Sequence, residues 1–118
     1  MHKAILLQQT DDKKTRAELV DQDDSALPDA AAHAVTVDVS WSTLNFKDAL
    51  AITGKGAVVR SWPLVPGIDL AGTVAESRDA NWAVGDQVVV TGWGMGESFW
   101  GGLTQRQRVQ ASWLLKIP

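Results

Sequence analysis

The sequence contains no cysteine, and its 118 residues include only two histidines, His2 and His33. A chain without thiols has no disulfide framework, no thiolate zinc site and no cysteine nucleophile. The absence of cysteine suits a cytoplasmic protein, which is the location that we expect. The two histidines are isolated, and neither has a neighbour at metal-ligand spacing. We therefore predict that both are surface residues.

Long hydrophobic runs and an excess of positive charge are also missing. The apolar run at residues 4–7 (AILL) is too short for a signal peptide or a membrane helix, so no membrane partner is expected. A net charge of −3 and a pI of about 5.2 argue against a surface for DNA or RNA. With 45% hydrophobic and 21% charged residues, the composition is that of a globular chain. The length predicts one domain over residues 1–118.

Short β-strand patterns make up most of what the sequence does contain. Within residues 34–41, Val35, Val37 and Val39 alternate with other residues, which predicts a strand with one buried face. Glycine and proline turns separate the strands, and this pattern predicts a mainly β barrel or sandwich. The other expected strands are 3–10 and 15–21, joined by a hairpin tip at 11–14, the apolar strand after the Pro-Gly turn at 66–67, then 86–92, an exposed strand at 104–110, and 113–118.

Only residues 45–53 (NFKDALAIT) are typical of a helix. Asn45 has a side chain suited to the N-cap position, and Gly54 follows at the C-terminal end, where glycine is favoured. The expected fold is therefore mainly β with one or two short helices.

Two stretches resemble binding motifs but lack a required residue. Residues 92–97 (GWGMGE) follow a strand, yet a dinucleotide fingerprint needs a third glycine where Glu97 stands and a helix afterwards. We interpret this stretch as a glycine-rich turn or bulge in preference to a phosphate cradle. The acidic residues 21–26 (DQDDSA) have no glycine where a calcium loop makes its sharp turn, and we interpret them as a solvated turn.

Three stretches together resemble the medium-chain dehydrogenase/reductase superfamily. They are 44–74, which contains LNFKDALAITGKG and PLVPGIDLAGTV, then 84–105 (VGDQVVVTGWGMGESFWGGLTQ) and 113–118 (WLLKIP). The chain is most similar to the zinc-free quinone oxidoreductase branch, and within it to the acrylyl-CoA reductase type. The similarity covers nearly the whole chain, and its divergent part is 11–33. It implies a GroES-like β-barrel, the substrate-side domain, with no Rossmann domain in residues 1–118.

The resemblance also makes predictions about cofactors. The complete family enzyme uses NADPH, held on a Rossmann domain that follows the barrel, so none is expected to bind to this chain alone. Zinc-dependent members carry Gly-His-Glu where Gly67-Ile68-Asp69 stands here, and a cysteine in place of Asn45. Because Ile68 has no lone pair, Asp69 alone cannot hold a catalytic zinc, and no metal is expected.

For the site itself, the resemblance points to Asn45 and Asp69 as catalytic residues. When hydride adds to an enoyl thioester, negative charge builds on the carbonyl oxygen, and a hydrogen-bond donor there stabilises the transition state. The Asn45 amide is such a donor, and the alternative is that Asn45 only caps the helix. Asp69 is either a direct participant or, as we favour, a hydrogen-bonding structural acid.

Around these two residues, the resemblance implies that Phe46, Asp48 and Trp93 line a substrate cleft. Asp48 has a second interpretation as a first-turn acid favoured by the helix dipole. Lys47 and Lys55 are candidates for contacts to the phosphates of coenzyme A, although solvated lysines are the simpler interpretation.

Two hypotheses for function follow. In the first, the chain is the catalytic domain of a reductase for an enoyl thioester or quinone, inactive until a nucleotide-binding domain completes it in cis or in trans. It predicts that Asn45, Asp69 and Trp93 converge on one open face. In the second, the chain is a free-standing binding or interaction module without enzymatic activity. In either case the apolar side chains of Trp93, Phe99 and Trp100 predict a homodimer through the face that carries them.

Overall fold

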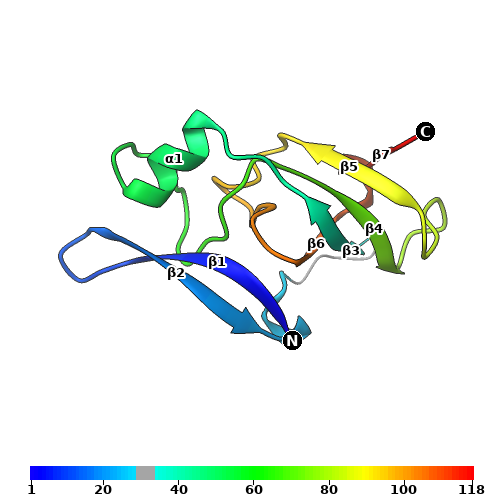
Figure 1. Ribbon diagram of the computed structural model, residues 1–118, viewed down its shortest axis with the longest axis horizontal. Helices are drawn as coiled ribbons and strands as arrows, with labels where there is room; N and C mark the ends of the chain where they lie inside the picture. The colour runs from blue at the N-terminus through cyan, green and yellow to red at the C-terminus, as the bar shows by residue number, and fades with distance from the viewer. Residues whose placement is uncertain (29–33) are drawn as a thin grey trace.

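Strands dominate the computed structural model, which describes residues 1–28 and 34–118 (Figure 1). Its strands are β1 (His2–Gln9), β2 (Thr15–Gln22), β3 (Ala34–Trp41), β4 (Asp69–Ser77), β5 (Gln87–Thr91), β6 (Arg106–Gln110) and β7 (Leu115–Lys116). One α-helix, α1 (Phe46–Thr53), and two 3-10 turns, η1 (Asp24–Ala26) and η2 (Ala111–Trp113), complete the described elements. The mainly β class is confirmed, and the described residues contain no Rossmann unit. His33 lies outside the described residues.

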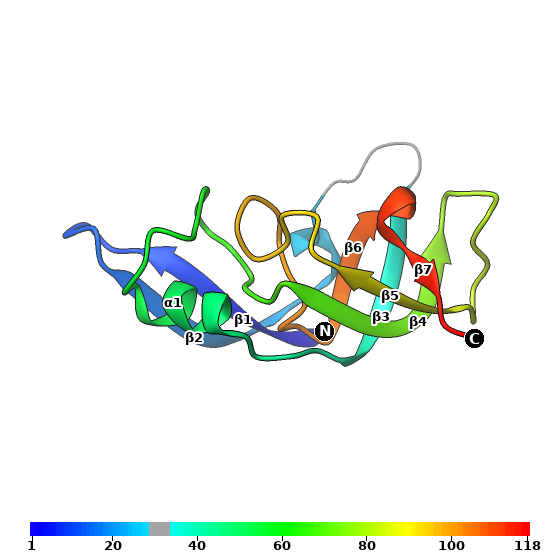
Figure 2. The same cartoon turned by 90° about the horizontal axis from the view of Figure 1, so that it is seen from above.

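The strands form two antiparallel sheets. The larger sheet has the order β6-β3-β4-β5-β7, and β1 pairs with β2 in a separate hairpin. Figure 2 shows the hairpin and α1 at one end of the molecule and the larger sheet at the other. Backbone hydrogen bonds join the two parts, because Leu7 and Leu64 exchange N–H···O bonds of 2.7 and 3.0 Å and Gln105 N–H donates to Lys3 O at 2.8 Å.

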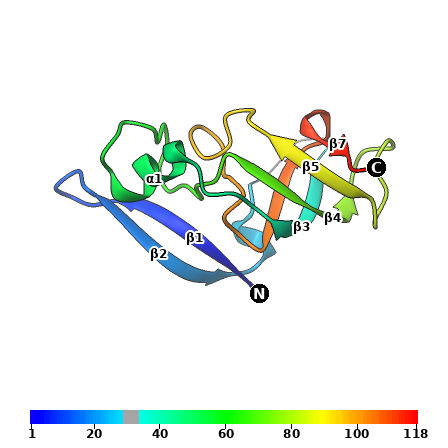
Figure 3. The ribbon, with the colours of Figure 1, turned by 45° about the horizontal axis from the view of Figure 1, so that its top comes forward.

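The core follows the strand periodicity. Val35 and Val37 of β3 are fully buried, Val39 is partly buried, and they pack with Val74, Val88 and other apolar residues of the larger sheet. A second cluster of Leu7, Ala51 and Leu64 packs α1 against the hairpin. Figure 3 shows α1 lying over the hairpin, with the loop that follows β5 between α1 and the larger sheet.

The expectation of an exposed strand at 104–110 is wrong. Gln107 and Val109 of β6 are fully buried, and only the alternate residues reach the surface. The polar residues of β6 do not indicate exposure, because the Gln107 amide has a hydrogen-bond partner inside the protein. Its Nε2 donates to Gly101 O at 2.7 Å. A buried polar side chain with a hydrogen-bond partner is compatible with a core position.

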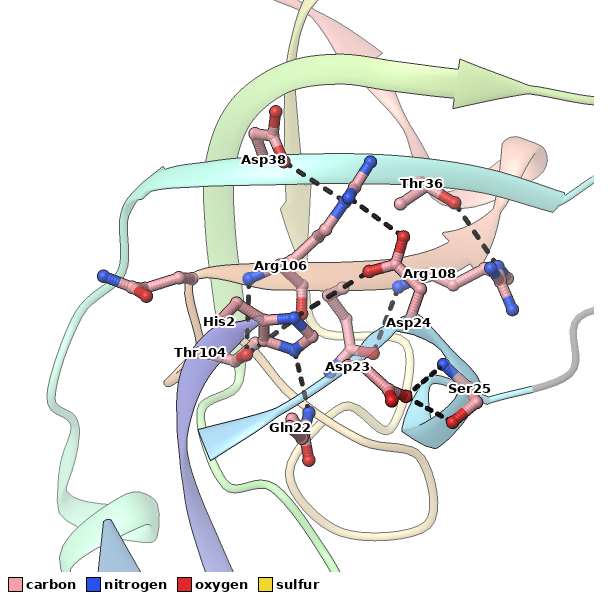
Figure 4. A network of polar contacts seen from close by, with 12 residues as sticks. His2, Gln22, Asp23, Asp24, Ser25, Thr36, Asp38, Thr104, Arg106 and Arg108 are labelled. Atoms are coloured by element: carbon pink, nitrogen blue, oxygen red, sulfur yellow. Dashed lines mark hydrogen bonds and ion pairs between the residues drawn. The ribbon is translucent and has the colours of Figure 1, made fainter. Parts of the chain in front are cut away.

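The expectation that His2 is a surface residue is also wrong. Its side chain is only 7% exposed, and its Nε2 lies 2.9 Å from Gln22 Nε2 (Figure 4). An amide nitrogen only donates, so His2 Nε2 accepts and the ring is neutral. The proton is then on Nδ1, which lies 3.9 Å from Asp24 Oδ1. Asp24 in turn binds Arg106 Nη1 at 2.9 Å, so the acidic turn at 21–26 is tied to β6 and is not simply solvated.

The burial of His2 predicts a loss of stability in mild acid. Burial lowers the pKa of His2 below its ordinary value of 6.5, and the attraction of Asp24 opposes this shift only in part. As pH falls below 6.5, the unfolded chain takes up a proton that folded His2 resists, so the free energy of unfolding decreases. In urea titrations at pH 7.5, 6.5 and 5.5, we expect this decrease in the wild type and a smaller one in His2→Gln. Equal pH slopes for both proteins would contradict the assignment.

Candidate functional site

The candidate site is built on the start of α1. Asn45 has extended backbone angles and serves as the N-cap, as expected, and Gly54 ends the helix in the left-handed region at φ 72°. The Asn45 N–H donates to Asp48 Oδ2 at 2.9 Å, while Asn45 O accepts the first helical bond from Ala49 at 3.1 Å. Together with Asp48, Asn45 forms a capping box, and the nitrogen of its side-chain amide remains available for other partners.

The Asn45 side chain belongs to a network of four residues that joins α1 to β4. Its Nδ2 donates to Thr43 Oγ1 at 2.7 Å, and the Thr43 hydroxyl donates to Asp69 Oδ1 at 2.6 Å. A longer contact of 3.4 Å runs from Asn45 Nδ2 to Asp48 Oδ2. We call Asp69, Thr43, Asn45 and Asp48 the four-residue network. It brings together three of the five residues that the sequence analysis proposed.

Thr43 was missed by the sequence analysis. Its hydroxyl accepts from Asn45 and donates to Asp69, so it fixes the direction of both hydrogen bonds. Ser42 adds a further link to β4, since its Oγ donates to Asp69 O at 3.0 Å. The available signal was two hydroxyl residues directly before the helix, but hydroxyls are common in loops and do not identify their partner.

Asp48 differs from an ordinary first-turn acid by its burial. Its side chain is only 1% exposed, and its Oδ1 has no hydrogen-bond partner in the described part of the chain. The position in the first turn agrees with the helix-dipole interpretation. That interpretation does not explain the buried Oδ1, since an unpaired buried acceptor costs free energy. The cleft role of Asp48 stays a prediction.

The other two cleft candidates occupy different surroundings. Phe46 is 79% exposed and directly follows Asn45 in the chain. Trp93 is 57% exposed, and its indole stacks on Trp113 with ring centres 6.3 Å apart. Asn45 and Asp69 are therefore joined through Thr43, whereas Trp93 takes no part in that network.

The loop after β5 is a series of glycine turns, as the sequence analysis favoured. Gly92, Gly94 and Gly96 all have positive φ, between 77° and 80°, and no helix follows. Gly92 N–H donates to Ile68 O and Gly96 N–H to Phe99 O, so these amides already have partners within the protein. The loop therefore offers no cluster of free amides for a pyrophosphate.

The same loop is fastened to both sides of the site. Lys47 Nζ forms an ion pair with Glu97 Oε1 at 2.6 Å, which ties the loop to α1 and gives Lys47 a partner inside the chain. Gly101 N–H donates to Val65 O at 2.6 Å and Gly102 N–H to Gly67 O at 3.2 Å. These bonds hold the segment that leads into Asp69.

A small cavity of about 140 Å³ opens beside Asp69. Its walls are mainly apolar and include Trp41, Leu70 and Ala71, with Thr43 and Asp69 at the polar edge. The volume is below that of a typical drug-sized pocket, so it suits only a short part of a ligand. In the described residues there is no group of three or more His, Cys, Asp or Glu side chains arranged to hold a metal ion, and the absence of zinc stays a prediction.

Comparison with protein families agrees with this architecture. The alcohol dehydrogenase GroES-like domain matches residues 31–118, which is most of the chain. The chain belongs to this GroES-like domain family. The expectation of a GroES-like fold is thereby confirmed, and residues of the four-residue network all lie inside the matched region.

Curated relatives of this GroES-like domain are reductases. The probable acrylyl-CoA reductase AcuI of Escherichia coli is 52% identical over 115 residues, and these cover 98% of the chain and 34% of the relative. Acrylyl-CoA reductase AcuI of Ruegeria pomeroyi is 50% identical over 93 residues, or 79% of the chain and 28% of the relative. The putative quinone oxidoreductase YhfP of Bacillus subtilis is 41% identical over 90 residues, or 76% and 27%. The expected similarity to both groups is confirmed.

Solved structures of oxidoreductases are also similar to this chain. The YhdH oxidoreductase of Salmonella enterica, in complex with NADP, has a TM-score of 0.90 and 52% identity, covering 98% of the chain and 35% of that structure. The YhfP protein of Bacillus subtilis, with NAD bound, has a TM-score of 0.90 and 33% identity, covering 99% and 34%. The GroES-like domain thus spans about a third of the length of the relatives it matches.

Two further expectations concern the membrane and self-association. In the described residues no helix combines the length and apolar character needed to cross a bilayer. Trp93 and Phe99 each keep more than half of their surface exposed, while Trp100 is partly buried. The homodimer expected from this apolar face stays a prediction, as does the cytoplasmic location.

Proposed function

We propose that residues 1–118 form the substrate-side domain of an NADPH-dependent, zinc-independent reductase for an enoyl thioester of the acrylyl-CoA type. The observation that carries the proposal is the four-residue network, two of whose members, Thr43 and Asp69, line an apolar cavity. The relatives named acrylyl-CoA reductase, at 52% and 50% identity, support this substrate over a quinone.

Asn45 is the proposed donor to the thioester carbonyl. Hydride addition at the β-carbon moves negative charge to the carbonyl oxygen, and a positioned N–H stabilises that charge. One Asn45 N–H is committed to Thr43 at 2.7 Å, while the other makes only the 3.4 Å contact with Asp48. The weaker contact is the one that a substrate oxygen replaces at little cost.

Asp69 is the proposed positioning residue. Its carboxylate accepts from Thr43, and Thr43 can then only accept from Asn45, so the amide keeps its nitrogen toward the network. The cavity beside Asp69, at about 140 Å³, accommodates a short acyl chain. Asp48 contacts the other side of the Asn45 amide at 3.4 Å.

The cofactor is assigned to a partner domain. Solved relatives hold NADP or NADPH, which supports NADPH for the complete enzyme. The glycine-rich loop of this chain does not fit a dinucleotide pyrophosphate, because most of its amides, those of Gly92 and of 95–99, are already bonded, so no step of hydride delivery is assigned to these residues. A nucleotide-binding domain, supplied in cis or in trans, would complete the enzyme.

A chimera tests this proposal. Residues 1–118 replace the aligned first third of the Escherichia coli relative, whose remainder supplies the other domain. We expect NADPH consumption with acrylyl-CoA, and a fall in kcat of about 100-fold in Asn45→Ala, the magnitude found for loss of one oxyanion donor. Asn81→Ala, at an exposed asparagine in the β4–β5 turn, is the matched control and should leave kcat unchanged. A folded chimera that binds NADPH but reduces no acrylyl-CoA would refute the proposed function.

A further inference from the structure

A second cavity, of about 480 Å³, lies outside the four-residue network and shares no residue with it. Phe99, Trp100 and Trp113 form its aromatic wall, and Arg108 and Gln110 approach from β6 and its end. This volume is in the range of small-molecule sites, and apolar walls with a few polar groups are their usual composition.

The aromatic wall is held in place by its own contacts. Trp113 lies between Trp93, stacked at 6.3 Å, and Phe99, tilted by 59° with ring centres 5.1 Å apart. Trp100 Nε1 donates to Pro63 O at 3.0 Å, which fixes the plane of that indole. The surface is therefore preformed, and a ligand that binds it loses little free energy in ordering these side chains.

Arg108 brings a positive charge to the cavity, and the two groups that accept from its guanidinium are neutral. Its Nε donates to Thr36 Oγ1 (Figure 4), and its Nη1 donates to Pro28 O, each at 3.3 Å. Within residues 1–28 and 34–118, no carboxylate forms an ion pair with Arg108 and Nη2 has no hydrogen-bond partner. The guanidinium is thus oriented, half-buried and still fully charged.

The neighbouring Arg106 shows the opposite situation. Its guanidinium lies 2.9 Å from Asp24, 3.3 Å from Asp38 and 4.0 Å from Glu76. All three carboxylates contact Arg106, and none of them forms an ion pair with Arg108. An arginine that lies beside a cavity and has no carboxylate partner among the described residues can pair with an external anion.

We propose that this cavity binds a small aromatic carboxylate. The ring packs against Phe99, Trp100 and Trp113, and the carboxylate accepts from the Nη1 and Nη2 edge of Arg108. The proposal is independent of the reductase function, because none of the residues that line this cavity has a role in it.

The test uses 2-naphthoate and the indole N–H signals of the 15N-labelled 118-residue chain. We expect the signals of Trp100 and Trp113 to shift on titration, while that of Trp41, at the other cavity, stays in place. Arg108→Gln should weaken binding about tenfold, as expected for loss of a charged hydrogen bond. Arg16→Gln, an exposed arginine on β2, is the matched control and should bind like the wild type.

A second ligand keeps the test decisive if Arg108→Gln does not fold. The neutral analogue 2-naphthalenemethanol has the same ring system without the charge, and it should bind the wild type about tenfold more weakly than 2-naphthoate. Equal affinities for the two ligands would overturn the proposal. So would the absence of Trp100 and Trp113 shifts at millimolar 2-naphthoate in a folded chain.

Discussion

Replacing Gly102 by alanine is expected to lower the free energy of unfolding by about 3 kcal/mol, at the upper end of overpacking costs. A Cβ at Gly102 would lie 2.0 Å from Asp69 O and 2.9 Å from Leu70 Cβ. Both atoms belong to β4, which pairs with β3 and β5 and cannot retreat without disturbing the larger sheet. Chemical denaturation followed by circular dichroism measures the loss directly.

The matched control for this prediction is Gly85→Ala. Unlike Gly102, Gly85 has a positive φ, of 96°, and an added Cβ there would meet nothing within 4 Å. We expect it to cost only the backbone strain, about 1 kcal/mol. Equal losses in Gly85→Ala and Gly102→Ala would mean that the close approach to Asp69 is not what requires glycine. The same contact borders the four-residue network, since Asp69 O accepts from Ser42 and Asp69 Oδ1 from Thr43.

Local signals explain which elements the sequence could predict. β3 occupies residues 34–41 as expected because its valines repeat every second residue over the whole strand. α1 has its expected boundaries because both caps, Asn45 and Gly54, are specified by neighbouring residues. In both cases the determining interactions lie within a few positions along the chain.

Tertiary contacts explain what the sequence could not predict. Gln107 looked solvent-facing because its partner, Gly101 O, is supplied by a loop that folds back under β6. His2 looked isolated because Gln22 and Asp24 reach it only through the hairpin. A polar residue does not reveal from the sequence alone whether the fold brings it a partner.

In the candidate site, too, some residues could be predicted from the sequence and others could not. The resemblance directed attention to Asn45 and Asp69, which lie 24 positions apart by their numbers in the sequence. The residue that joins them, Thr43, belongs to no sequence pattern that would identify it. Its role depends on the start of β4 lying beside the segment before α1, which only the folded chain shows.

The 118-residue chain by itself is expected to show no NADPH binding at low micromolar concentration. Tight binding of a dinucleotide needs a cluster of free amides or a helix N-terminus for the pyrophosphate and a cation for the 2′-phosphate. The glycine-rich loop at 92–96 has internal partners for Gly92 and Gly96 and leads into no helix. Lys47, at the near end of α1, is already paired with Glu97.

The same chain is therefore expected to reduce no acrylyl-CoA, although Asn45 and Asp69 are in place. Holding the hydride donor against the substrate carbon is a large part of catalysis, and under the proposed function residues 1–118 supply only the substrate side of that geometry. Calorimetric titration with NADPH and an NADPH-consumption assay, run beside the active chimera, measure both expectations. Micromolar binding to the isolated chain, or turnover that Asn45→Ala abolishes, would establish that this domain is an enzyme on its own.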